Sequence, residues 1–511
     1  MKSLSFLIII LIGFLQGISI SFLFLIPLLI FSYFFFLKTI INEKSTKKSF
    51  FIGWYFGFGF FLGSMHWIIS PFLIYEKHFY LSPFIIIIFP LFMGLFFSIH
   101  SLLISEFKKK YNLKNGNFLF TKSFFVSLFF FLTEVIRSSI FGGLPFNLTA
   151  HLWAYQSDFI QTSKIYGVFG LSFLTINWIT LISLNFFSKK NMSALIILIF
   201  FPFSLIIAGK FLNLEKLDDG KINQISVRVV QPNIPQIEKW NRLLFQDNLE
   251  KLIELTKINN NSDEKKIVVW PEVALTSYFN EDKELDEYLR KNIPSNVILI
   301  TGTLRREFAN QDFKIFNSLF ILKDKDHFFY DKKKLVPFGE FIPLRQLFAF
   351  AKLTPGSGEF DVGQKPNLIE LKLNDFKIII EPSICYEAIF QTFGTNNSNL
   401  FVNVTNDAWF GKTTGPRQHL AAQIFRSVEK GVPLIRSSNS GISVITDLNG
   451  KILKRIDLDK YGYIEGNIAV ISSETFFEKN KNKSLLILLF VLILIFYLID
   501  IVISFKRNQV T

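Results

Sequence analysis

The feature that most constrains this chain is a series of long apolar runs concentrated at its two ends. The hydrocarbon core of a bilayer is about 30 Å thick, so a helix that crosses it needs roughly 20 apolar residues. The run 4–36 is long enough for two such helices. Single helices are expected at 50–73, 81–104, 118–140, 168–187, 193–211 and 484–505. The sequence therefore predicts a polytopic α-helical membrane bundle with about eight spans.

Residues 212–483 differ from these ends, because their composition is that of an ordinary soluble domain. We expect a bundle of about seven helices over 1–211, an α/β domain over 222–480 and a last membrane helix at 484–505. The apolar run after Lys2 lacks an Ala-x-Ala cleavage pattern, so an uncleaved first helix is expected.

Basic residues in the short loops predict the orientation of the helices, since cytoplasmic loops are enriched in lysine and arginine. The net charge is +14, and many of the lysines lie between apolar runs, so we expect them to set membrane topology and expect no nucleic-acid partner. All the basic loops fall on one side when both chain ends are cytoplasmic, and the domain 222–480 then lies outside the cytoplasm. These basic residues are Lys38, Lys44, Lys47, Lys48, Lys108, Lys109, Lys110, Lys114, Lys122, Lys189, Lys190, Lys506 and Arg507.

The middle of the chain alternates strand patterns with helix patterns, which is typical of a layered α/β sandwich. A hairpin is expected around Asn449 and Gly450, because Asn-Gly supplies a tight turn. No metal-ligand spacing or phosphate-binding glycine loop is found, so neither a metal nor a cofactor is expected. The expected strands are 225–230, 267–270, 297–304, 317–322, 376–384, 400–404, 442–446 and 451–456, and the expected helices are 242–259 and 416–430.

Cys385 is the only cysteine of the chain, and it follows a run of isoleucines that predicts a buried strand. Two interpretations are open: a small apolar side chain in the core, or a nucleophile. Outside the cytoplasm a lone thiol has no intramolecular disulfide partner, which favours a reactive thiol unless it is fully buried. Glu272 and Lys332 also follow strand-like or turn-rich segments. A carboxylate can act as a base and an ammonium can hold an oxyanion, although such residues are more often solvated surface.

Three motifs follow one another in the order Trp270-Pro271-Glu272, then Tyr-x-Lys-x-x-Leu-Val-Pro-Phe-Gly-Glu over 330–340, then Ile384-Cys385-Tyr386-Glu387. They resemble the Glu-Lys-Cys triad of the nitrilase (carbon–nitrogen hydrolase) superfamily. With apolar runs on both sides, nearly the whole chain resembles the bacterial apolipoprotein N-acyltransferase family. Further matching stretches are 231–234 with Trp240, 403–411, 416–419, 436–441 and 134–173.

The resemblance implies a nitrilase-like α-β-β-α sandwich outside the cytoplasm, with Cys385 as the nucleophile, Glu272 as the general base and Lys332 as the oxyanion stabiliser. Lys332 is preferred to its neighbours because it stands eight residues before Glu340, as the family motif requires. The supporting residues that the resemblance implies are Glu340, as an additional acid, and Trp240, Tyr386 and Glu387, which would shape the site.

The resemblance also implies the reaction. A phospholipid, phosphatidylethanolamine by resemblance, would donate an acyl chain to the cysteine, and the thioester would acylate the N-terminal amine of a diacylglyceryl-cysteine apolipoprotein. The expected location is the bacterial inner membrane, with the catalytic domain on the periplasmic side, and a monomer is expected.

Two other functions stay open. The same triad in a membrane-anchored amidase would use water as the acceptor and would release product without any lipoprotein. A transporter is a second alternative, although charged residues are sparse inside the spans and no broken-helix repeat is visible.

Three local features have no assigned role. The apolar segment 342–353 is either a lid that dips into lipid or a core-packing helix. Glu381 adds a charge upstream of Cys385 and would raise the pKa of the thiol if it pointed inward. Phe316 stands where the family pattern has Tyr, a departure that leaves the triad residues in place.

Overall fold

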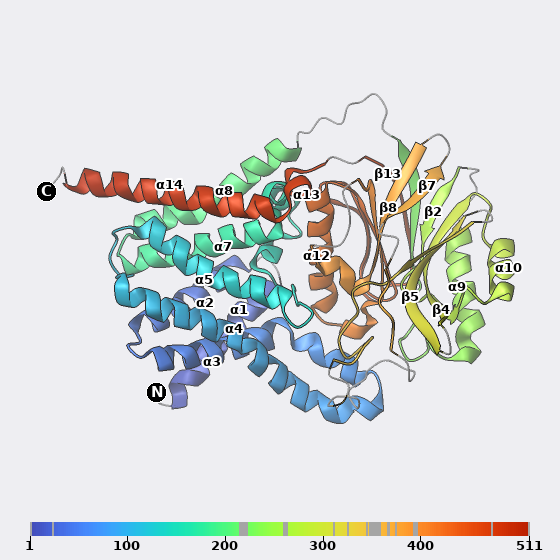
Figure 1. Ribbon diagram of the computed structural model, residues 1–511, viewed down its shortest axis with the longest axis horizontal. Coiled ribbons are helices and arrows are strands. Elements are labelled where there is room, and N and C mark those ends of the chain that lie inside the picture. Colours follow the sequence, from blue (N-terminus) through green and yellow to red (C-terminus); the bar gives the residue numbers. More distant parts are fainter. Residues whose placement is uncertain are drawn as a thin grey trace. The chain divides into compact units, whose positions relative to one another are not determined.

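The computed structural model of this chain divides into two compact units (Figure 1). One unit holds Met1–Ile69, Tyr80–Glu215 and Thr475–Thr511, and the other holds Ser70–Phe79 and Lys216–Glu474. The structure describes residues 3–22, 25–213, 223–258, 264–309, 312–323, 326–343, 346, 359–364, 368–373, 376–391, 397–471 and 474–508.

The first unit is built from apolar helices. Among the described residues, five are long and apolar enough to cross a membrane, or six if α3 and the 3-10 helix η1 that follows it form one bent span. Two further apolar helices are shorter. The number of spans therefore stays a prediction. The apolar helices are α1 (Ser3–Ser21), α2 (Ile26–Asn42), α3 (Thr46–Ser64), α4 (Ser82–Lys110), α5 (Leu119–Ser139), α7 (Ser163–Phe187), α8 (Asn191–Asn213) and α14 (Asn482–Asn508).

The helix expected over 50–73 is interrupted. Helix α3 ends at Ser64, and the chain bends by 53° into η1 (His66–Leu73). Pro71 lies inside that 3-10 helix, where it lacks the N–H that an α-helix would require. The run 168–187, by contrast, is the regular part of α7, because Gly167 has non-helical backbone angles (φ 71°, ψ 176°).

Glycines allow α1 and α3 to pack with their backbones nearly touching. A Cβ on Gly13 would lie 2.0 Å from the carbonyl oxygen of Phe56, and one on Gly59 would lie 2.0 Å from that of Ile10. Small residues at helix contacts of this kind are a common way for helices to associate in a membrane, where no hydrophobic effect drives them together.

The second unit contains two sheets. One has the order β13-β1-β2-β4-β5-β6 with β3 paired to β4, and the other has the order β12-β11-β10-β9-β8-β7. The strands of the first are β1 (Gln224–Gln231), β2 (Lys266–Val269), β3 (Leu275–Tyr278), β4 (Val297–Ala309), β5 (Asp312–Lys323), β6 (Asp326–Asp331) and β13 (Gly462–Ala469). Those of the second are β7 (Ile369–Leu373), β8 (Phe376–Ile384), β9 (Leu400–Thr405), β10 (Leu434–Ser438), β11 (Ser443–Thr446) and β12 (Ile452–Ile456).

The two sheets pack against each other, and helices cover their outer faces (Figure 1). Alternate residues such as Val227, Val229, Ile378 and Ile380 fill the core between the sheets. The opposite residues of the first sheet pack against α9 (Phe245–Lys257) and α10 (Lys283–Asn292). Helix α12 (Gly415–Lys430), whose residues after Arg417 are all buried, lies on the outer side of the second sheet. This is the α-β-β-α sandwich that the sequence predicted.

Parallel pairing places several strand ends at one edge of the sandwich. Strands β1, β2 and β4 are parallel to one another, as are β8, β9 and β10. Each strand expected from the sequence is present, whereas β3, β6, β7, β10 and β13 were not anticipated. The expected hairpin joins β11 to β12, with Gly450 at φ 72°.

Candidate active site

The three residues expected to carry the chemistry all follow strands of the sandwich. Glu272 lies three residues beyond the end of β2, Lys332 directly follows β6, and Cys385 directly follows β8. The carboxyl ends of parallel strands gather at one edge of a sheet, and such edges commonly hold binding sites. These side chains accordingly come from both sheets to one place.

Lys332 joins two carboxyl groups. Its Nζ lies 3.3 Å from Oε1 of Glu272 and 2.8 Å from Oε1 of Glu340. The amide of Asn317 donates to the same two oxygens, at 2.9 and 2.8 Å. The main-chain N–H of Val336 donates to the other oxygen of Glu340 at 2.9 Å. The expected residues Glu272, Lys332 and Glu340 thus form one buried cluster, and Asn317 is a member that sequence reasoning missed.

The charge of Lys332 is fixed by these partners. Burial lowers its pKa, but the charges of Glu340, Glu272 and Cys385 outweigh burial and raise the pKa above its ordinary value. Its main-chain N–H also donates to the carbonyl of Asn317 at 2.8 Å. A permanent ammonium held in place is suited to stabilising an oxyanion.

Cys385 lies in a strained turn. Its φ is 49°, a left-handed conformation that a non-glycine residue adopts at a cost of about 1–3 kcal/mol. The side chain is 8% exposed. Burial, then Glu272, raise the pKa of the thiol to about 12, although Lys332 and a hydrogen bond with Thr405 oppose the shift. The resting group is therefore a protonated thiol, which needs a base during attack.

The neighbours Tyr386 and Glu387 differ in what they contact. Glu387 is fully buried and accepts hydrogen bonds from the main chain of Ile384 at 2.8 Å and from the hydroxyl of Tyr330 at 3.1 Å. Burial raises its pKa to about 7, against the effect of main-chain N–H donors. The ring of Tyr386 packs edge-on against Phe390, with centroids 5.0 Å apart. Glu387 therefore ties the turn at Cys385 to β6.

Glu381 has a partner of its own. It lies 2.8 Å from Nζ of Lys430, and both side chains are buried. The hydroxyl of Ser398 donates to it at 3.3 Å. The raised pKa of Cys385 traces to burial and Glu272, so Glu381 is accounted for as half of a buried ion pair. Most of the segment 342–353 lies outside the described residues.

A second lysine beside Glu272 was not anticipated. Lys239 is 7% exposed, and its Nζ donates to the main-chain carbonyl of Glu272 at 2.7 Å. Burial lowers its pKa to about 8, although Glu272 and Cys385 oppose the shift. The expected residue Trp240 follows it, and within the described part of the chain the indole N–H of Trp240 is buried without a hydrogen-bond partner.

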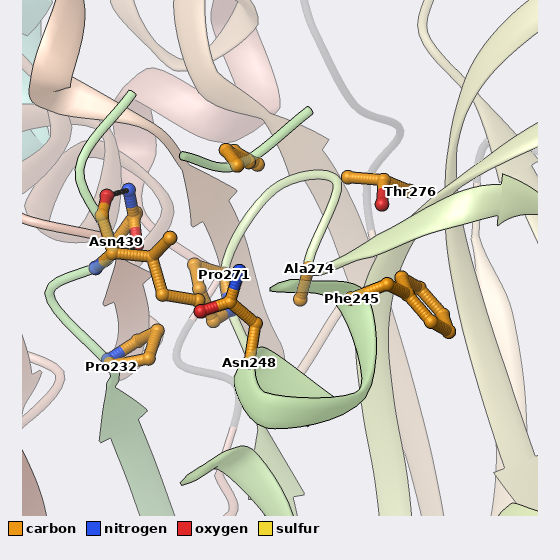
Figure 2. Close-up of a pocket in the computed structure, with 9 residues that line it drawn as sticks. Pro232, Phe245, Asn248, Pro271, Ala274, Thr276 and Asn439 are labelled. Atoms are coloured by element: carbon orange, nitrogen blue, oxygen red, sulfur yellow. Dashed lines mark hydrogen bonds between the residues drawn. The ribbon is translucent and has the colours of Figure 1, made fainter. Parts of the chain in front are cut away.

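Lys239 also lines a small pocket (Figure 2). Figure 2 shows Asn439 and Pro232 on one side of this space and Phe245 and Thr276 on the other. The pocket has a volume of about 10 Å³, about the space that one water molecule needs. It is too small to hold an acyl chain in this conformation.

Three further buried polar residues lie near the cysteine, in the stretches 403–411, 416–419 and 436–441 that matched the family pattern without an assigned role. Asp407, His419 and Arg436 are each at most 1% exposed, and a ring nitrogen of His419 lies 3.1 Å from the carbonyl oxygen of Cys385. Among the residues that the structure describes, no group of three or more His, Cys, Asp and Glu is arranged to hold a metal ion.

The arrangement contains the kinds of group that acyl transfer through a thiol requires. It brings together a thiol, a carboxyl group that can take its proton, and an ammonium that can hold a developing negative charge. The supporting residues Glu340 and Glu387 contact this group directly or through the main chain.

Two family models match this chain in sequence. The one described as "Apolipoprotein N-acyltransferase N-terminal domain" matches residues 12–181, and the one described as "Carbon-nitrogen hydrolase" matches residues 226–473. The second match identifies the sandwich as a nitrilase-like fold.

Curated relatives match nearly end to end. The chain is 34% identical to "Apolipoprotein N-acyltransferase" of Rickettsia bellii over 96% of this chain and 97% of that protein. It is 34% identical to the protein of the same name in Rickettsia prowazekii, over 96% and 98% of the two chains. For the protein of that name in Rhodopseudomonas palustris, the identity is 26% over 84% and 81%. The resemblance seen in the motifs is confirmed, and the chain belongs to the apolipoprotein N-acyltransferase family.

Proposed function

We propose that this protein transfers an acyl chain from a membrane phospholipid to the N-terminal amine of apolipoproteins, through a thioester on Cys385. The observation that carries the proposal is the convergence of Glu272 and Lys332 on the single thiol of the chain: both charges act on the pKa of Cys385. Family membership along nearly the whole chain supports the substrate class.

In the first half-reaction, Glu272 takes the thiol proton as Sγ of Cys385 attacks the ester carbonyl of the phospholipid. The S–C bond forms, and Lys332 holds the resulting oxyanion. The C–O bond of the ester then breaks, the leaving oxygen takes the proton from Glu272, and a lysophospholipid departs. The raised pKa of the thiol is the reason a base is needed at this step.

In the second half-reaction, the α-amine of the diacylglyceryl-cysteine attacks the thioester carbonyl. Glu272 takes a proton from the amine as the C–N bond forms. The C–S bond breaks, and the proton returns to the sulfur of Cys385, which restores the resting thiol. Lys332 again holds the oxyanion, so the same three groups serve both steps.

Both substrates are anchored in lipid, which supports placing the site at a bilayer surface. The proposed topology has eight spans, made by the eight apolar helices of the first unit, with the sandwich on the periplasmic side of the inner membrane. Lysines in the loops after α2 and α4, such as Lys44 and Lys114, support a cytoplasmic position for those loops. Phosphatidylethanolamine is the proposed donor, and a monomer is the proposed state.

The acyl-enzyme is tested by intact mass. The native protein is incubated with phosphatidylethanolamine vesicles, and the expected result is a mass increase of one acyl chain on Cys385 that apolipoprotein peptide removes. The Cys385→Ala variant is the control. An acyl adduct on that variant would overturn the mechanism. Free fatty acid released as fast without peptide as with it would instead favour the amidase alternative, in which water is the acceptor.

Topology is tested separately. Because the chain has a single cysteine, Cys385→Ala gives a background free of thiols, into which Lys412→Cys or Lys47→Cys is introduced. A maleimide that cannot cross membranes is expected to label position 412, but not position 47, in intact spheroplasts. Labelling in the reverse pattern would overturn the proposed orientation.

A further inference from the structure

Behind the nucleophile lies a buried cluster of charged side chains that the proposed reaction does not use. Asp407 follows β9, Arg436 lies on β10, and His419 lies on α12. Nδ1 of His419 is 2.9 Å from Oδ1 of Asp407, and Arg436 forms an ion pair with the other oxygen of Asp407. A Cβ on Gly441 would lie 2.2 Å from Asp407, so the carboxylate has no room to move on that side.

The second ring nitrogen of His419 reaches the nucleophile. Nε2 lies 3.1 Å from the main-chain oxygen of Cys385, across 34 residues of sequence. A carbonyl oxygen can only accept a hydrogen bond, so this contact requires a proton on Nε2. The ring of Phe410 also packs against that of His419, with centroids 5.5 Å apart.

The ring needs two protons to satisfy both neighbours. Burial raises the pKa of Asp407, but Arg436 and His419 outweigh burial and hold that pKa below its ordinary value. An ionised carboxylate only accepts, so both contacts are made together only by the doubly protonated ring, a form that the lowered pKa of His419 restricts to lower pH. Gln423 fits this assignment: its amide lies 3.1 Å from Nε2, and its oxygen lacks a partner among the described residues. If the amide is turned over, that oxygen accepts from Nε2–H, since O and N of such amides are assigned from their contacts.

The turn at Cys385 needs support of this kind. Its positive φ of 49° is a strained conformation that persists only where the surroundings hold it. Glu387 holds the N–H of Ile384, on the amino side of the cysteine. His419 holds the carbonyl of Cys385, on the carboxyl side. The two contacts together fix the direction in which Sγ points.

We propose that His419, oriented by Asp407 and Arg436, is a positioning residue that holds Cys385 in its attacking conformation through the main-chain carbonyl. The proposal rests on the function proposed above, in which Cys385 is the acyl carrier. His419 does not touch the acyl group. It acts through the backbone, so its loss is expected to slow acylation of Cys385 while leaving the binding of phospholipid unchanged.

The groups that face His419 determine how the contact responds to pH. Among the described residues they include Asp407, Arg436, the amide of Gln423 and the carbonyl of Cys385. Burial and Arg436 lower the pKa of His419, against Asp407 and the carbonyl. When the ring loses one proton, the ionised Asp407 retains the proton on Nδ1, and the carbonyl of Cys385 loses its donor.

Two substitutions separate the two ring contacts. In His419→Gln the amide nitrogen reaches the position of Nε2, so the donor to Cys385 is kept and the donor to Asp407 is lost. In His419→Asn the amide nitrogen reaches the position of Nδ1, so the reverse holds. The full-length protein in detergent micelles is incubated with phosphatidylethanolamine, and the rate of thioester formation is followed by intact mass.

Acylation by His419→Gln is expected to stay within about tenfold of the native rate, and acylation by His419→Asn to fall by about 10²-fold, since a small misplacement of a reacting group has effects of that size. The KM for phospholipid stays unchanged in both. The ratio of the His419→Gln rate to the native rate rises with pH, because the amide does not titrate. If His419 served only to stabilise the fold, His419→Gln would be the slower variant, because it leaves the buried Asp407 without its donor from position 419. Equal rates, or a faster His419→Asn, would overturn the proposal.

If both variants fail to fold, a measurement on the native protein tests the proposal instead. The rate at which the C2 proton of His419 exchanges with deuterium, followed by peptide mass against pH, gives the pKa of that ring. The proposal requires the ring to be protonated at the pH where thioester formation is fastest, and a ring already neutral there would overturn it. Native protein that forms no thioester at all contradicts the proposed function itself, which is a different result from either variant outcome.

Discussion

Two buried lysines lie beside Glu272, and their surroundings move their pKa values in opposite directions. Nζ of Lys332 contacts carboxylate oxygens of Glu272 and Glu340, whereas Nζ of Lys239 contacts only a main-chain carbonyl among the described residues. Burial lowers the pKa of both. For Lys332 the two carboxylates outweigh burial and the pKa rises, while for Lys239 burial prevails and the pKa falls to about 8.

The difference shows that the partner, more than the depth of burial, decides whether a buried lysine keeps its charge. A carboxylate gives the ammonium a counter-charge, whereas a carbonyl offers only a dipole. Lys332 is therefore a permanent cation, suited to an oxyanion. Lys239 is an ammonium close to losing its proton, suited to holding the main chain that carries Glu272.

Removing Lys332 should have the largest effect. In Lys332→Met the carboxyl groups of Glu272 and Glu340 lose the cation that they share. We expect thioester formation to fall by about 10²–10³-fold, and unfolding free energy to drop by about 3–5 kcal/mol. Intact mass and the melting temperature in detergent measure the two effects.

The matched control for this variant is Lys412→Met, because the side chain of the native Lys412 is 82% exposed. Its contact with Asp459 lies at the surface, where such pairs contribute about 0–1 kcal/mol. Both its rate and its melting temperature should stay near the native values. A Lys332→Met variant that resembled this control would contradict the role given to Lys332.

The effect of Lys239 should instead appear in how the free energy of unfolding changes with pH. Its pKa falls from 10.5 to about 8 on folding, so between these values the unfolded chain binds more protons and stability rises with pH. A difference of about 2.5 pH units corresponds to about 3 kcal/mol across that window. In Lys239→Met this rise should be absent, with stability at pH 7 close to native, because a buried ammonium is lost together with one hydrogen bond.

The comparison is made by melting native and Lys239→Met protein side by side from pH 7 to 10.5. Other groups that titrate in this range affect both proteins alike, so the difference between them isolates Lys239. A difference that does not change with pH would show that Lys239 has an ordinary pKa in the folded state.

The sequence predicted the Glu272 cluster but missed Lys239, for a physical reason. Residues that follow parallel strands reach one edge of a sheet whatever the loops do, so the strand pattern placed Glu272 and Cys385 at that edge, and the family resemblance implied their roles. Lys239 lies in an irregular loop, where nothing in the pattern distinguishes a buried lysine from an exposed one. Asn317 was missed because it lies within β5, where an asparagine in a strand gives no sign of what it faces.

The membrane helices teach a similar lesson. Apolar length predicted α5, α8 and α14 within a few residues, because a bilayer imposes length directly. It could not predict the 53° bend after Ser64, which depends on local backbone geometry. In the second unit, the sequence pattern likewise could not show that Glu381 pairs with Lys430, because the two residues lie 49 positions apart in the chain.

Replacing Asn317 should change the rate or the stability less than replacing either Lys332 or Lys239. Its amide donates to both Glu272 and Glu340, so Asn317→Ala removes two hydrogen bonds but leaves Lys332 between the carboxylates. We expect thioester formation to fall by about tenfold, from one or two hydrogen bonds to charged groups. In Asn317→Asp a third carboxylate would face the other two, and a larger loss is expected. Equal effects of the two substitutions would argue that Asn317 acts through packing alone.

Replacing Trp240 should have the smallest effect on stability, and it is the most sensitive test of the difference between Lys332 and Lys239. Its indole N–H is buried without a hydrogen-bond partner in the described part of the chain, so Trp240→Phe keeps an aromatic ring next to Lys239 in sequence and removes no hydrogen bond among the described residues. Stability should change by no more than about 0.5 kcal/mol, and the pH dependence that belongs to Lys239 should be unchanged. If acylation nevertheless falls while stability holds, the indole N–H donates to substrate, and the loop that carries Lys239 belongs to the binding site as well as to its support.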